Sequence, residues 1–129
     1  MPYLHSIKLE RQTFAFLKVG EIIGNNELNA SNYKSRVESM GMMIHHNGLV
    51  STLSILKNAK SDEDKLIYKH LAQWVHQKEV IGFTFNLQPD DLLTKILAIT
   101  DSRVLLALTI EALALTDVMK EILKAEVYD

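Results

Sequence analysis

The sequence predicts an all-α fold: a single compact bundle of five to six helices over residues 1–129. Three observations predict it. Apolar residues recur at spacings of three and four along most of the chain, only two prolines occur, and the glycines fall mostly where helices would end. A chain of this length has the usual size of one domain and can bury one core.

The first half of the chain predicts three helices. The helix over residues 6–23 is expected to point four apolar residues inward: Leu9, Phe16, Val19 and Ile23. A second helix is expected after Ser31, its N-cap, with another inward stripe: Tyr33, Val37, Met40 and Ile44. Asn47 and Gly48 interrupt this pattern, so we assign them a structural role as C-cap and tight turn. The third helix follows at once and is expected to bury Leu49, Leu53 and Leu56.

The second half predicts a helix that starts at Ser61, ahead of three acidic residues, and buries Ile67, Leu71 and Trp74. Residues 80–85 are interpreted as an apolar loop, and Pro89 as the first position of a short helix. The last helix is expected from Asp101 or Ser102 to about Glu126. Its apolar positions repeat at spacings of three and four: Leu105, Leu108, Ala112, Leu115, Met119 and Ile122. Because its first half is apolar on nearly every face, we expect it to be the central and most buried helix.

The composition excludes several classes of protein. There is no cysteine, which rules out a disulfide scaffold, a thiolate metal site and a cysteine nucleophile, and fits a reducing cytoplasm. The N-terminus lacks the apolar core of a signal peptide. The longest apolar-rich stretch, residues 104–115, is too short and too polar to span a bilayer.

The sequence contains few of the motifs that catalytic sites need. Glycine-rich phosphate loops, nucleophile elbows and HExxH pairs are absent from the sequence. His45 and His46 are neighbours that diverge on a helix, and His70 and His76 are six residues apart, so neither pair suits one metal ion. We therefore expect no metal, no cofactor and no catalytic residue. An enzyme that uses Glu111 or the histidines remains an alternative.

Glu111 is the one ionisable residue with apolar helical neighbours on most sides. A carboxylate that is buried alone is costly, so it should be paired or neutral. A catalytic acid needs a second group, and none accompanies it in the sequence. We therefore predict a structural role: an ion pair or hydrogen bonds that tie the last helix to another helix.

The basic residues are unevenly distributed. Residues 1–60 hold seven Lys/Arg and four Asp/Glu, whereas the remainder carries the excess of acid, and the whole chain has a net charge of −2. Lys8, Arg11 and Lys18 fall within one sector of the first helix, and Lys34 and Arg36 lie early in the second. A row of cations suits a phosphate backbone and carries no base information. These five are the candidate residues for contact with the phosphate backbone of a nucleic acid; a solvated helix face remains the alternative.

Three segments resemble one family. Residues 33–49 (YKSRVESMGMMIHHNGL), the opening residues 11–15 (RQTFA) and residues 108–115 (LTIEALAL) are similar to the small subunit of type III-B (Cmr) CRISPR effector complexes. The Asn-Gly-Leu junction is the most specific of these motifs. Four positions depart from the family pattern: Gly41 stands where proline is typical, His45 and Glu121 where arginine is, and Val118 where tryptophan is.

The resemblance implies a bundle of five to six helices that binds no cofactor and catalyses nothing. Its implied partners are the other Cmr subunits, further copies of itself, and guide and target RNA. In that family several copies stack along the paired RNA as an inner filament, while other subunits cleave RNA. The alternative from a different class is a protein-only scaffold or adaptor that makes no contact with nucleic acid.

Overall fold

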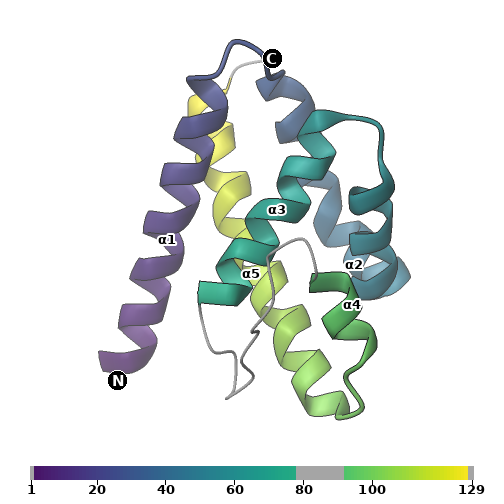
Figure 1. Cartoon of the computed structure of the whole chain (residues 1–129). Helices are drawn as coiled ribbons and strands as arrows, with labels where there is room; N and C mark the ends of the chain where they lie inside the picture. Colours follow the sequence, from purple (N-terminus) through teal and green to yellow (C-terminus); the bar gives the residue numbers. More distant parts are fainter. Residues whose placement is uncertain (1, 78–91, 128–129) are drawn as a thin grey trace.

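The computed structural model describes the backbone of residues 2–77 and 92–127, and the side chains of residues 7–76 and 92–127. Its helices are α1 (Pro2–Ile23), α2 (Ala30–Asn58), α3 (Asp62–Gln77), α4 (Leu92–Leu97) and α5 (Ser102–Glu126), packed side by side (Figure 1). The described ranges contain no strand, and the predicted all-α class is confirmed. The interpretations of residues 80–85 and of Pro89 concern residues outside those described.

The predicted second and third helices form one element with a single interruption. Gly48 has φ 84° and ψ 164°, whereas Gly41, where the family tends to have proline, stays helical. This backbone conformation is open essentially to glycine alone, because a Cβ atom would clash with the neighbouring carbonyl. The Thr52 hydroxyl donates to the Gly48 carbonyl at 2.9 Å, one turn back along the helix. The second half of α2 therefore takes a new direction (Figure 1), and its Leu49 and Leu53 line one small cavity with Leu92 and Ile96 of α4.

Side chains cap the N-termini of α2, α3 and α5. Ser61 Oγ accepts from the Asp64 amide at 3.2 Å, and Asp101 accepts from the Arg103 amide at 2.9 Å, both as expected. For α2 the predicted cap was wrong. Asn29, not Ser31, accepts from the Asn32 amide at 3.0 Å, so the helix begins at Ala30.

The buried residues of α2, α3 and α5 follow the predicted stripes. The predicted inward residues of these helices that are buried are Tyr33, Val37, Met40, Ile44, Leu49, Leu53, Leu56, Ile67, Leu71, Trp74, Leu108, Ala112, Leu115 and Met119. Two predicted members of the α5 seam, Leu105 and Ile122, are half-buried against this core. Together with residues of α1 and α4 they form one hydrophobic cluster.

The predicted inward face of α1 was wrong. Leu9, Phe16 and Ile23 are exposed, and only Val19 of the expected set is buried. The face in the core is instead the one with Phe14, Ala15, Val19 and Ile22. The helix has two apolar faces, and periodicity alone cannot rank them. The buried face also carries Arg11, whose guanidinium pairs with Glu111 of α5, so burying this face supplies the carboxylate with a cation.

The first half of α5 is also less enclosed than expected. The helix packs against α1, α2 and α3, which places it centrally. Leu106 and Ile110 are nevertheless about 60% and 57% exposed, because these neighbours cover only part of its circumference. Exposed large apolar side chains therefore occur on both α1 and α5. No helix in the described ranges is long and apolar enough for a membrane span.

Candidate nucleic-acid interface

The five predicted RNA-binding cations do not share one open surface. Lys8 is exposed on α1. The other four have partners within the chain: Arg11, Lys18, Lys34 and Arg36. The structure thus brings each of these four to a fold contact that the sequence pattern did not indicate.

Arg11 lies in an ion pair that joins α1 to α5. Its Nε and Nη2 donate to Oε1 and Oε2 of Glu111 at 2.8 and 2.9 Å. Trp74 Nε1 of α3 donates to the same Oε1 at 2.8 Å, so one carboxylate links three helices. The Arg11 side chain is only 16% exposed. The ion pair and hydrogen bonds predicted for Glu111 are present.

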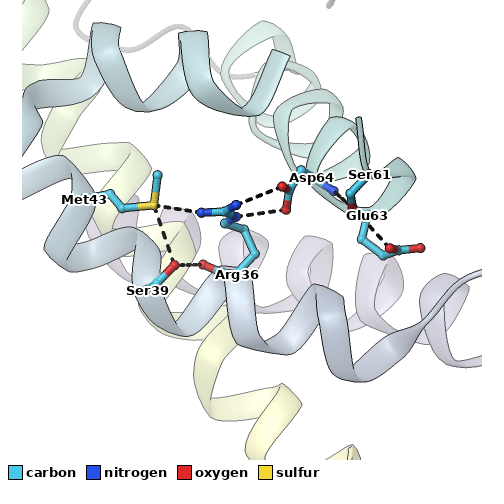
Figure 2. Close-up of polar contacts among 6 residues, drawn as sticks. All are labelled: Arg36, Ser39, Met43, Ser61, Glu63 and Asp64. Atoms are coloured by element: carbon cyan, nitrogen blue, oxygen red, sulfur yellow. Dashed lines mark hydrogen bonds and ion pairs between the residues drawn. The ribbon is translucent and has the colours of Figure 1, made fainter. Parts of the chain in front are cut away.

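Arg36 is held in the same way between α2 and α3, as Figure 2 shows. Its Nε and Nη2 donate to the two oxygens of Asp64 at 2.9 and 3.0 Å, and Nη1 lies 3.5 Å from Met43 Sδ. The hydrogen bonds to Asp64 raise the pKa of Arg36. The Ser61 hydroxyl accepts from the Asp64 amide and donates to Oε1 of Glu63, both at 3.2 Å, so it caps the start of α3. This bidentate pair fastens the first turn of α3 to α2.

Two lysines of the predicted row are partly engaged. Lys18 Nζ lies 3.6 Å from Glu21 and 5.4 Å from the centre of the Phe14 ring. Lys34 Nζ donates to the Val127 carbonyl at 2.9 Å and so holds the end of α5. Neither is a free surface cation.

Lys57, Lys65 and Lys69 line a different surface, the wall of an open pocket of about 520 Å³ beside α3. Our sequence prediction assigned no role to the two α3 lysines. Their spacing of four residues places them on one helix face, which is the signal that could have identified them. The fold adds Lys57 from the last turn of α2, which no spacing within α3 reveals.

The remaining predicted structural residues lie at the break in α2. Gly48 supplies the non-helical conformation there, and Asn47 precedes it with an exposed side chain. His45 and His46 are exposed on the preceding turn. Among the described residues, no group of three or more His, Cys, Asp and Glu could hold a metal ion.

Two buried titratable side chains of the described residues, Tyr33 and His70, face each other inside the bundle. The Tyr33 hydroxyl is 2.7 Å from Nδ1 of His70, and Met119 Sδ is 4.0 Å from the same hydroxyl. Burial, helped by the charges of Lys18 and Lys69, lowers the pKa of His70 to about 4. Burial also raises the pKa of Tyr33. Both groups are therefore neutral near pH 7, and their hydrogen bond ties α2 to α3.

These features define a class of protein: a small helical bundle whose strongest polar contacts join its own helices. The family model of the CRISPR-associated protein Cas_Cmr5 matches residues 7–126. The chain belongs to this family, the small subunits of the type III-B Cmr complex. No curated protein and no solved structure matches it.

Proposed function

We propose that this chain is a non-catalytic cytoplasmic subunit that stacks with further copies of itself in an inner filament of the Cmr complex. In this role it binds no cofactor or metal and contacts the backbone of guide and target RNA. Cleavage chemistry belongs to other subunits.

The observation that carries the stacking role is the position of the exposed apolar side chains. We propose that four of them, on two helices that pack against each other, act as one docking surface, the α1–α5 apolar face: Leu9, Phe16, Leu106 and Ile110. On α1, Leu9 and Phe16 are seven residues apart and so share one side of the helix. Soluble monomers rarely leave large contiguous apolar patches exposed, and such patches commonly mark protein interfaces.

A second set of exposed apolar residues supports stacking in one direction. Ile55 in the second half of α2 and Leu97 at the end of α4 are exposed. In Figure 1 these elements lie at the edge of the bundle opposite to α1. Two different surfaces that meet between successive copies make a heterologous contact, which generates an open filament when the rotation does not close.

The protein-only scaffold remains the second candidate, and one observation favours it. Arg11 and Arg36, the two arginines of the predicted RNA row, are both held by carboxylates within the fold. Contact with RNA would then depend on lysines, which bind phosphate as point charges without bidentate geometry.

The stacking role can be tested by reconstituting the complex with Leu9→Asp/Phe16→Asp and counting copies by native mass spectrometry. Because both side chains are exposed, the isolated variant should melt like the parent, yet fewer copies should enter each complex. Leu17→Asp is the matched control: Leu17 is equally exposed on α1 but lies about 100° away from Phe16. Unchanged copy number in the double variant would contradict stacking through the α1–α5 apolar face.

A further inference from the structure

The pocket beside α3 combines charge with an apolar wall. It lies between the loop that follows α1, the last turn of α2 and the first two turns of α3, and its volume is about 520 Å³. Pockets for small ligands usually fall between about 300 and 1,000 Å³. Lys57, Lys65 and Lys69 line it together with Leu28 and Leu66.

The three lysines differ from the cations that stabilise the fold. Arg11 and Arg36 each make a bidentate pair with a carboxylate. Lys57, Lys65 and Lys69 are exposed, and none of them is in an ion pair or hydrogen bond with another described residue. Their ammonium groups are therefore available to an anion at no cost to internal pairing.

The charge of the pocket limits which anion fits. Two carboxylates, Glu27 and Asp62, also line it, so three lysines leave a net charge of about +1 at neutral pH. A triphosphate carries far more negative charge than this wall offsets. A single phosphodiester, with one negative charge, matches it.

The uncharged part of the wall indicates what accompanies the phosphate. Leu28 and Leu66 offer an apolar surface. The Asn25 side-chain oxygen already accepts from the Glu27 amide at 2.9 Å, so it is engaged within the loop. An apolar surface can therefore pack against Leu28 and Leu66 while the lysines hold the phosphate.

We infer that this pocket binds one nucleotide unit of a single RNA strand, with the phosphodiester near Lys65 and Lys69 and the base against Leu28 and Leu66. The inference deepens the RNA contact of the proposed function and rests on it. It places the RNA contact in the pocket beside α3 and not on the five predicted cations of α1 and α2. An acidic peptide is the competing occupant, and the experiment separates the two.

The test measures binding of fluorescein-labelled oligo-U and oligo-A octamers to the isolated full chain by anisotropy, over a series of salt concentrations. One phosphodiester contact in the pocket contributes about −0.7 to the log–log salt slope for a single strand. Lys65→Glu/Lys69→Glu should weaken binding by about tenfold or more and reduce the slope by about 0.7, since the one phosphodiester contact of the pocket is lost. Oligo-U and oligo-A should be affected alike.

The matched control is Lys120→Glu/Lys124→Glu, which makes the same change of charge at the same spacing on α5. It should alter affinity by no more than about twofold, because it changes only the long-range field. Equal losses in the two double variants would overturn the inference in favour of general electrostatic attraction. Displacement of RNA by a glutamate-rich peptide at equal charge concentration would overturn it in favour of a peptide site.

Failure of this inference can be told from failure of the proposed function. If Lys65→Glu/Lys69→Glu enters the reconstituted complex normally and binds RNA like the parent, the pocket is not the RNA site and the subunit role stands. If the parent chain itself does not enter the complex, the proposed role fails, whatever the isolated chain binds.

Discussion

Replacing Glu111 tests the contact that joins α1, α3 and α5. The change to alanine leaves the Arg11 guanidinium facing no anion and Trp74 Nε1 without its acceptor. The change to glutamine keeps one oxygen but places an amide NH₂ group opposite a nitrogen of Arg11. The two substitutions therefore remove different parts of the same interaction.

The expected magnitudes follow from the burial of the pair. Breaking a fully buried ion pair costs about 3–5 kcal/mol, because the remaining charge has no partner. Arg11 and Glu111 keep 16% and 17% of their side chains exposed, so water recovers part of that loss. We expect Glu111→Ala to lower the free energy of unfolding by about 3 kcal/mol and Glu111→Gln by about 1 kcal/mol.

A double-mutant cycle isolates the pair. Arg11→Met and Glu111→Ala, alone and combined, should show a coupling energy of about 1.5–3 kcal/mol in urea unfolding. Circular dichroism at 222 nm is the suitable signal, because Trp74 belongs to the contact and its fluorescence would change directly. The pair Lys18–Glu21, within one turn of α1 and with an exposed Glu21, serves as control and should couple by less than about 0.5 kcal/mol.

Additive effects of Arg11→Met and Glu111→Ala, within about 0.3 kcal/mol, would refute this reasoning. The pair would then be a surface contact with no measurable role in stability. A coupled pair also has a practical consequence. Charge reversal at Arg11 would set two carboxylates against each other, so it cannot serve as a clean test of RNA binding.

Three further predictions concern the break in α2, the core and the buried histidine. Gly48→Ala should lower the free energy of unfolding by about 1–3 kcal/mol, because alanine is strained in the backbone conformation of position 48. Gly41 lies in regular helix with open space for a methyl group, so Gly41→Ala should raise the free energy of unfolding by up to about 1 kcal/mol. Equal effects of the two substitutions would contradict the strain at position 48. Leu115→Ala should cost about 2–5 kcal/mol and the exposed Leu106→Ala less than about 0.5 kcal/mol, and similar losses at both would place the core elsewhere. Well above pH 6.5, His70 is neutral in both the folded and the unfolded state. As the pH falls toward 4, His70 binds a proton in the unfolded chain but stays neutral in the folded chain, where its pKa is about 4. The free energy of unfolding should therefore fall by about 3 kcal/mol across this window. His70→Gln should remove that part of the pH dependence, and parallel pH–stability curves for parent and variant would show that the histidine is not responsible.

The fold was largely predictable because helical periodicity is a local signal. The stripe that begins at Tyr33 is the one strongly apolar face of its helix, so only one orientation hides it from water. The all-α class and most of the core could therefore be predicted from spacing. The same reasoning failed for α1, where Phe14 and Phe16 lie on different faces and both faces are apolar enough to bury.

The candidate site was less predictable, because the availability of a cation depends on distant residues. Arg11 and Lys8 are both basic residues early in α1, yet Glu111, one hundred residues after Arg11, forms an ion pair with Arg11 and not with Lys8. Likewise, the spacing of Lys65 and Lys69 shows a shared helix face but gives no indication of the pocket that the loop after α1 completes.

What the sequence determined by itself is the set of helices, the break at Gly48, and the need of Glu111 for a partner, because each depends on neighbours within a few residues or on the cost of burying a lone charge. Only the tertiary structure decided which face of α1 is buried, which cations are paired, and which lysines border a common pocket. These outcomes depend on contacts between residues far apart in the chain. Among alternative faces of similar hydrophobicity, the packed bundle selects the one whose polar groups also find partners.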